Sequence, residues 1–367
     1  MSAQGSGALL DRGVAERTAA ATVAGLGRLG SRSPAPDPYR REEVRAACEE
    51  GIGVAAQLSG LGPVAGPPMA ELIDRRAWAS NALDSIAAAA GHLGERIPGG
   101  LGLPGPLGGI ATRGVGIAIG AEAGAAAGYA ASRVLGQYDL SLIGPPRPAR
   151  LLFVGANLDA ARRELGADRA QFLRWIAIHE TTHVLQLESV EWLAAHIRGL
   201  ATGLLDAAAE GLERRSLGDL GRRLLRAPGD LVRAALHGEL ARLLADPAQR
   251  AALDRLQATM AVIEGHAEHV MDGGDELLGP GVEELRRRMD RRRADRGGLA
   301  EIVSRLMGMD MKLRQYELGK AFCDRVAGEA GEDALRLVWR SPDDLPNLAE
   351  LEAPGRWLER VGPPVAA

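Results

Sequence analysis

Hydrophobic residues recur at three- and four-residue steps along most of this chain, the spacing that places them on one face of an α-helix. Helical patterns of this kind cover residues 42–61, 69–93, 114–132, 157–165, 172–190, 200–245, 247–272 and 309–327. A different pattern occurs at residues 151–154, a short continuous hydrophobic run that is typical of a buried strand. These patterns predict a mainly α-helical protein with a minor β-sheet.

Two of the predicted helices have recognisable ends. Asp168 followed by Gln171 is typical of a helix N-cap with its capping-box partner, just before the hydrophobic period begins. Asn157 is expected to cap a short helix that ends at Gly166. The second of these helices directly follows the predicted strand.

Composition divides the chain into three parts. Residues 1–37 are rich in Ala, Gly, Ser and Pro, and we expect a weakly ordered leader or a loosely docked helix there. Residues 38–150 form a predicted N-terminal helical lobe, interrupted by a Gly- and Pro-rich loop at residues 94–109. Residues 151–367 form a predicted metal-binding lobe.

The strongest chemical signal is the pentapeptide His-Glu-Thr-Thr-His at residues 179–183, inside a long helical pattern. Histidines four residues apart share one face of a helix, so His179 and His183 are predicted to bind one zinc ion. The Glu180 carboxylate is then expected to reach a water molecule in the open position of the metal and to take its proton. The alternative is a pair of core histidines that are satisfied by hydrogen bonds.

A catalytic zinc site needs a third protein ligand. Glu264 lies on the hydrophobic face of the helical pattern 247–272, where a carboxylate is costly unless it is paired or bound to a metal. We therefore predict Glu264 as the third ligand, with His266 and His269 as rivals. Glu268, one turn later, is a further candidate, either as a ligand or as a hydrogen-bond partner of a ligand histidine.

Three further features bear on the expected site. Gly265 lowers helix propensity, which indicates the close approach of another backbone or of the metal site. Tyr316 is a candidate for stabilising the oxyanion, and its alternative is a packed tyrosine with the hydroxyl at the surface. By analogy with zinc peptidases, the strand at residues 151–154 is expected to pair with an extended substrate.

Charge and cysteine content exclude several classes of partner and compartment. The 44 basic and 48 acidic side chains give a net charge of −4, so neither a nucleic acid nor an anionic membrane surface is an expected partner. Cys48 and Cys323 lie far apart without metal-ligand spacing, which predicts reduced, buried thiols in a cytoplasmic protein. The charged residues near the N-terminus do not match a secretory signal peptide.

The stretch 114–132 has glycine at every fourth residue and carries only one charged side chain, Glu122. Such spacing is familiar from membrane helices, so a transmembrane span has to be considered. The Ala and Gly content and the central carboxylate instead favour a soluble helix packed tightly against its neighbours.

Residues 179–183, together with Gln186, Trp192 and the run 264–266, resemble the zincin-like metallopeptidases of the type-2 group. Proteins of this group are also labelled zinc-dependent metalloproteases or deazaflavin-coenzyme-biosynthesis-associated hydrolases. The further matching positions are residues 134–139, 312–316, Trp339, Pro342, Leu345, Pro346, Glu350 and 354–357. The resemblance implies a mostly helical zincin-like fold with a long HExxH helix, a zinc site and hydrolase activity, and it supplies no substrate.

The sequence leaves two classes of function open. The first is a zinc-dependent metallohydrolase, best described as a metallopeptidase, with Glu180 as general base and a peptide or protein as substrate. The second is a zinc-stabilised interaction or regulatory protein without turnover, for which the helical runs at residues 114–132 and 200–245 would suit partner binding. The sequence does not distinguish them and gives no oligomeric state.

Overall fold

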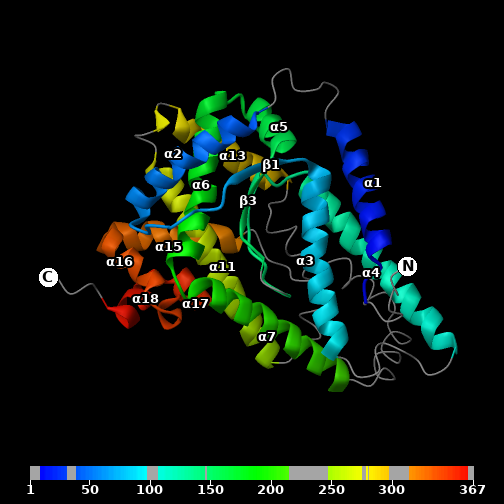
Figure 1. The fold of residues 1–367 in the computed structure, drawn as a ribbon. Helices are drawn as coiled ribbons and strands as arrows, with labels where there is room; N and C mark the ends of the chain where they lie inside the picture. The colour runs from blue at the N-terminus through cyan, green and yellow to red at the C-terminus, as the bar shows by residue number, and fades with distance from the viewer. Residues whose placement is uncertain are drawn as a thin grey trace.

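The computed structural model describes residues 9–30, 39–96, 106–144, 147–214, 247–274, 278–279, 281–296 and 314–362. Helices make up most of this part of the chain (Figure 1). They are α1 Arg12–Gly30, α2 Arg41–Ser59, α3 Arg75–Arg96, α4 Pro106–Ala131, α5 Gly155–Leu165, α6 Arg169–Ser189, α7 Leu193–Arg214, α11 Pro247–Gly273, α13 Val282–Arg296, α15 Arg314–Ala330, α16 Glu332–Arg336, α17 Leu348–Glu352 and α18 Pro354–Val361. The prediction of a mainly α-helical protein with a minor sheet is confirmed.

One three-stranded sheet lies between two groups of helices (Figure 1). Its strands are β1 Ala70–Ile73, β2 Gly136–Asp139 and β3 Arg150–Val154, in the order β1-β3-β2. The central strand β3 is parallel to β1 and antiparallel to β2. Strands β1 and β2 lie within residues 38–150, whereas all of β3 except Arg150 lies within residues 151–367. The sheet therefore joins the two lobes expected from composition.

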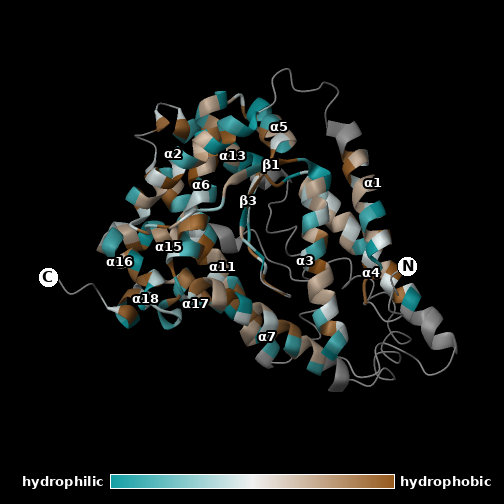
Figure 2. Cartoon of the chain, viewed as in Figure 1, coloured by the Kyte–Doolittle hydropathy of each residue, from teal (hydrophilic) through white to brown (hydrophobic). Residues whose placement is uncertain are grey.

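Helix α6 forms the middle of the larger hydrophobic core. It packs against α2 on one side and against α11 and β2 on others. Phe172 and Trp175 are completely buried on α6, and Phe153 of β3 lies in the same core. In Figure 2 most helices carry hydrophobic and hydrophilic residues along the same length, as expected for helices that bury one face.

A second core surrounds the middle of α11. Phe322 of α15 and Trp357 of α18 are buried there with their rings edge to face at 5.2 Å between centroids. The indole of Trp357 donates a hydrogen bond to the Asp344 carbonyl, and Arg360 pairs with the buried carboxylate of Glu350. The C-terminal segment thereby covers α11 and α15 and is fixed against them.

Helix α1 lies in the stretch expected to be weakly ordered or loosely docked, and it is in fact closely packed. A Cβ built on Gly120, Gly124 or Gly128 of α4 would lie within 3.0 Å of the carbonyl oxygen of Asp11, Ala15 or Ala19, respectively. The glycines of α4 thus let the α1 backbone approach directly, and the prediction of a tightly packed helix at residues 114–132 is confirmed. Val115, Ile117 and Ile119 of α4 remain exposed.

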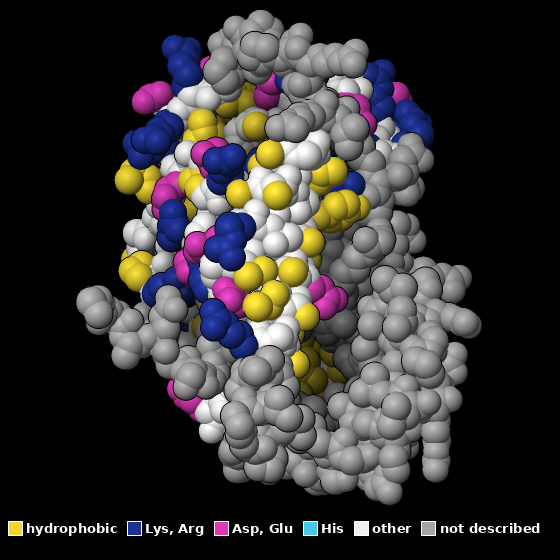
Figure 3. Space-filling view, turned by 90° about the vertical axis from the view of Figure 1, so that its right-hand side faces the viewer, with side chains coloured by type: hydrophobic (Ala, Val, Ile, Leu, Met, Phe, Trp, Pro, Cys, Tyr) yellow, Lys and Arg dark blue, Asp and Glu magenta, His cyan; other side chains and the backbone are white. Residues whose placement is uncertain are grey.

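Figure 3 looks onto the side of the molecule on which Figure 1 places α1 and α4, and it shows hydrophobic side chains bordered by charged ones. Among the described residues, no helix is long and apolar enough to cross a membrane.

Several predicted boundaries are wrong. Residues 70–73 form β1, so the helix expected from residue 69 begins only at Arg75. The loop expected up to residue 109 ends earlier, because α4 begins at Pro106. Residues 136–139, for which no strand was predicted, form β2. In each case pairing with β3 or packing on α1 overrides the local pattern.

The prediction that Asn157 caps α5 is also wrong. The helix begins at Gly155, and the buried Asn157 amide donates hydrogen bonds to the carbonyls of Ala131 and Val134. Its side-chain oxygen accepts a hydrogen bond from Arg75. The predicted end of α5 is confirmed, since Gly166 adopts the left-handed conformation of a C-cap with φ of 61°.

Candidate metal centre

Helix α6 presents the two histidines of the pentapeptide on one face, as its period predicts. Asp168 caps the helix by accepting a hydrogen bond from the Gln171 backbone at 2.9 Å, so the predicted N-cap is confirmed. The Gln171 side chain departs from the capping box and donates to the Leu278 carbonyl. Within the helix, the hydroxyl groups of Thr181 and Thr182 donate to carbonyls one turn earlier, so both buried side chains are satisfied.

Glu264 of α11 lies opposite the two histidines. Its Oε2 is 3.7 Å from Nε2 of His179 and 3.7 Å from Nε2 of His183. One ligand atom from each residue lies within 4.8 Å of the others. Two imidazoles and one carboxylate form a donor set that suits zinc and leaves a fourth tetrahedral position open. The donor chemistry and the spacing of these three residues therefore fit a zinc ion.

Burial governs the electrostatics of the centre. Burial raises the pKa of Glu180 to about 7, against the opposing effect of the nearby His179. Burial also lowers the pKa of His183. For His179 burial lowers the pKa, but the carboxylates of Glu264 and Glu180 outweigh it and the net shift is upward. A divalent cation at this point would favour neutral imidazoles and charged carboxylates.

A buried amide connects His183 to α11. Oε1 of Gln186 lies 2.9 Å from Nδ1 of His183. Nε2 of Gln186 donates to the Ile263 carbonyl at 2.9 Å and lies 3.0 Å from Nδ1 of His266. The sequence pattern identified Gln186 only as a matching position, although its place one turn after His183 on a buried face was a signal for such a contact.

The rival ligands lie in other environments. His266 is buried against Trp339, with 5.0 Å between ring centroids, and burial lowers its pKa to about 3. His269 is held between Asp324 at 2.8 Å and Glu332 at 3.1 Å. Glu268 accepts a hydrogen bond from Arg286 at 3.2 Å, and its charge raises the pKa of His179. Among the described residues, only His179, His183 and Glu264 form a group with metal-binding spacing.

Strand β2 lies directly beside the pentapeptide, which the sequence did not indicate. A Cβ on Gly136 would lie 2.6 Å from both Cδ and Oε1 of Glu180, so the carboxylate packs against the strand backbone. The prediction that residues 151–154 pair with an extended substrate is wrong. These residues belong to β3, which pairs with β1 on one side and β2 on the other and has no free edge. The edge strand next to Glu180 is β2.

Two predicted features on α11 and α15 have different outcomes. A Cβ on Gly265 would lie within 3.0 Å of the backbone of Gly319 on α15, so the close backbone approach predicted at Gly265 is confirmed. The side chain of Tyr316 lies outside the residues that the structure describes, and its role in oxyanion stabilisation stays a prediction.

The buried, unbonded thiols expected for Cys48 and Cys323 are present.

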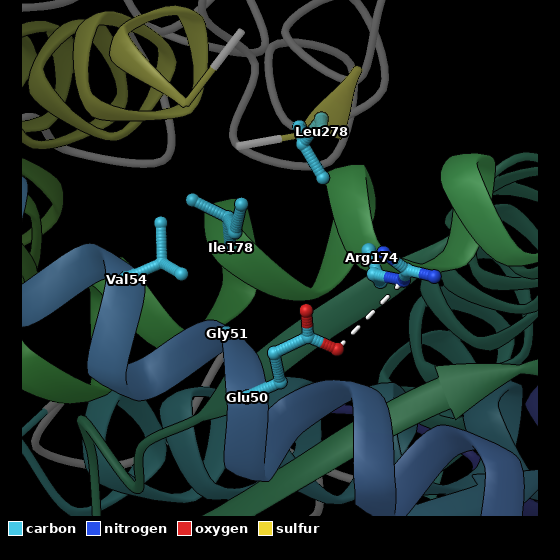
Figure 4. Close-up of a pocket in the computed structure, with 6 residues that line it drawn as sticks. All are labelled: Glu50, Gly51, Val54, Arg174, Ile178 and Leu278. Atoms are coloured by element: carbon cyan, nitrogen blue, oxygen red, sulfur yellow. Dashed lines mark ion pairs between the residues drawn. The ribbon is translucent and has the colours of Figure 1, made fainter. Parts of the chain in front are cut away.

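A small pocket between α2 and α6 is separate from the candidate centre (Figure 4). Arg174 and Ile178 contribute to it from a different face of α6 than His179 and His183. Across the pocket, Glu50 lies 3.7 Å from Arg174 as an ion pair. None of the three candidate ligands lines this pocket.

Comparison with known proteins gives one family and one solved structure. The family model described as Zincin-like metallopeptidase matches residues 10–358. A solved structure described as a "putative hydrolase with a novel fold from Chloroflexus aurantiacus" is similar with a TM-score of 0.64 and 26% sequence identity. The similarity covers 96% of this chain and 98% of that one. No curated protein matches the sequence.

Proposed function

This chain belongs to the zincin-like metallopeptidase family, and we propose that it is a zinc-dependent hydrolase that cleaves peptide bonds with Glu180 as general base. The observation that carries the proposal is the convergence of His179, His183 and Glu264 within 4.8 Å of one another. The similarity to a protein described as a putative hydrolase supports the reaction class.

In the proposed reaction zinc supplies Lewis acidity, which makes a water molecule more acidic and polarises the carbonyl group under attack. His179, His183 and Glu264 would hold the ion, and Glu180 would remain outside the ligand set. The Glu180 carboxylate takes a proton from the attacking water and delivers it to the leaving amine. Its burial, at 6% exposure, keeps bulk water from competing for that proton.

The position of β2 supports a peptide as the substrate. Among the described strands, β2 pairs only with β3, so its outer edge has no strand partner. Strand β2 also contacts α6, and Gly136 touches the Glu180 carboxylate. An extended peptide that adds to this edge would place a backbone carbonyl near the proposed catalytic groups. Strand β2 therefore takes the role that the sequence had suggested for residues 151–154.

Two variants test the proposal by separating metal binding from proton transfer. Glu180→Gln should keep one zinc per chain and lose cleavage of susceptible peptides by roughly 100- to 10,000-fold, the usual contribution of a general base. His183→Ala should lose both zinc and cleavage, because two protein ligands hold zinc poorly. Susceptible peptides can be found by comparing proteome-derived peptide mixtures treated with wild type and with Glu180→Gln.

The outcomes distinguish the two classes of function. Purified wild type without bound zinc after zinc loading would overturn the metal site. Zinc-bound wild type that cleaves no peptide differently from Glu180→Gln would overturn the peptidase and favour the zinc-stabilised interaction protein. Loss of zinc from Glu180→Gln would make Glu180 part of the ligand set.

A further inference from the structure

Gln186 contacts three groups at once, and all three belong to the two helices that carry the candidate ligands. Its Oε1 faces Nδ1 of His183 at 2.9 Å, while its Nε2 faces the Ile263 carbonyl and Nδ1 of His266. The side chain is completely buried. The geometry therefore fixes all three polar partners of the Gln186 amide, and bulk water does not reach them.

The Ile263 carbonyl determines which way the amide points. A carbonyl oxygen only accepts hydrogen bonds, so the group that faces it must be the NH₂ of Gln186. The second N–H of that group then donates to Nδ1 of His266. This orientation leaves Oε1 facing His183, and because an amide oxygen only accepts, Nδ1 of His183 must carry the proton.

We propose that Gln186 is a positioning residue that holds His183 as the Nδ1–H tautomer, with the lone pair of Nε2 directed at the metal. The proposal deepens the proposed function and rests on the zinc site described there. Nε2 of His183 is the atom that faces Glu264, at 3.7 Å. A ligand histidine whose other ring nitrogen donates to a fixed acceptor is held in one tautomer and one ring orientation.

The same amide also relates α6 to α11. Ile263 immediately precedes Glu264, so the hydrogen bond to its carbonyl fixes the backbone that carries the third ligand. His266 in turn packs edge-on against Trp339, and the Trp339 carbonyl accepts a hydrogen bond from the Trp192 indole at 3.0 Å. Gln186 thus sets both the proton position on His183 and the spacing between the two ligand-bearing helices.

Gln186→Met tests this assignment, because methionine has a similar length and cannot make the three hydrogen bonds. We expect its zinc dissociation constant, measured by competition with a chromophoric chelator, to rise roughly 10- to 100-fold. Gln249→Met is the matched control. Gln249 is also buried and donates to a carbonyl, that of Ala207, but it does not contact the candidate centre. It should bind zinc within about twofold of wild type.

A second measurement reads the tautomer of His183 in the wild-type protein itself. Long-range proton–nitrogen correlation spectra of metal-free wild type with ¹⁵N-labelled histidine, at a pH where His183 is neutral, report the tautomer of each ring. His183→Asn identifies the resonance of His183. We expect the Nδ1–H tautomer in wild type and an increased population of the Nε2–H tautomer in Gln186→Met.

Each outcome supports or overturns the assignment. An Nε2–H tautomer in metal-free wild type would overturn it, as would Gln186→Met with wild-type zinc affinity. Failure of the proposed function is distinguishable, because wild type would then bind no zinc while the spectrum of the metal-free protein still tests the role of Gln186.

Discussion

Gly136 and Glu180 are in such close contact that a side chain of any size at position 136 would occupy the space of the carboxylate. A Cβ there would lie 2.6 Å from Cδ and Oε1 and 2.7 Å from Cγ of Glu180. The atoms in the way are the end of a flexible side chain, so the carboxylate would move and the backbone would stay. The strand thereby sets the position of the proposed general base.

We predict that Gly136→Ala displaces the Glu180 carboxylate and lowers peptide cleavage by about 100-fold, the usual effect of a misplacement of about 1 Å. Zinc content should remain at the wild-type value, since the three atoms nearest to that Cβ all belong to Glu180 and none to a candidate ligand. Steady-state kinetics and metal analysis of the same preparation check both expectations.

The control for this variant is Gly199→Ala, because a Cβ on Gly199 of α7 meets no atom within 4 Å. It should leave cleavage unchanged and raise stability slightly, since alanine favours a helix over glycine. Full activity in Gly136→Ala would show that Glu180 does not need its observed position.

The crossing of α11 and α15 leads to a prediction about stability. A Cβ on Gly319 would lie within 3.0 Å of the Ala261 carbonyl, so backbone meets backbone with nothing flexible between. Gly319→Ala should lower the free energy of unfolding by about 1–3 kcal/mol, the usual cost of overpacking. Urea denaturation followed by circular dichroism measures this change.

Gly328→Ala on the same helix provides the comparison, because Gly328 is exposed and a Cβ there meets no atom within 4 Å. It should be neutral or slightly stabilising. Equal stability of the Gly319 and Gly328 variants would contradict the close crossing.

Removal of the metal should destabilise the protein. A ligand that binds only the folded state adds about 2.7 kcal/mol of stability at 100 times its dissociation constant. The three candidate ligands come from α6 and α11, which are far apart in sequence, so the unfolded chain lacks the site. A chelator should therefore lower the thermal midpoint of wild type and leave that of His183→Ala unchanged. A shift of the same size in both proteins would show that the effect comes from another metal.

His269 gives a prediction about pH. Burial lowers its pKa, but the hydrogen bond to Asp324 and the charge of Glu332 outweigh this effect, and the pKa is raised overall. Lys320 also pairs with Asp324 and carries the same positive sign as a protonated His269. A histidine whose pKa is raised on folding stabilises the protein below its unfolded pKa of about 6.5. That contribution is lost as the pH rises through the higher pKa of the folded state.

We therefore expect His269→Gln to cost more stability at pH 5.5 than at pH 9. Urea denaturation of wild type and variant at both pH values measures the two differences, and subtraction removes the contributions of other titrating groups. A cost that is the same at both values would mean that the charge of His269 does not stabilise the fold.

The parts of the site that follow from helical periodicity were predictable from the sequence. His179 and His183 share a face because they lie four residues apart, and Glu264 was identified because a carboxylate on a hydrophobic face needs a partner. The Asp168 cap is equally local, since it depends on backbone groups within one turn. These predictions required no knowledge of which elements meet.

The parts that depend on distant partners were not predictable. Strands β1 and β2 are four residues each, and only their pairing with β3 distinguishes them from helix or turn. Asn157 matches a helix cap in sequence, yet its amide donates hydrogen bonds to backbone carbonyls more than twenty residues earlier in the chain. The contact between Gly136 and Glu180 likewise exists only because β2 lies along α6.

The close packing of α1 on α4 makes the surface of α4 dependent on the first helix. In a shortened chain that begins at α2, Gly120, Gly124 and Gly128 would face water beside Ala127, which is otherwise fully buried. Removal of α1 would therefore leave an exposed apolar strip on α4, a kind of surface that favours aggregation.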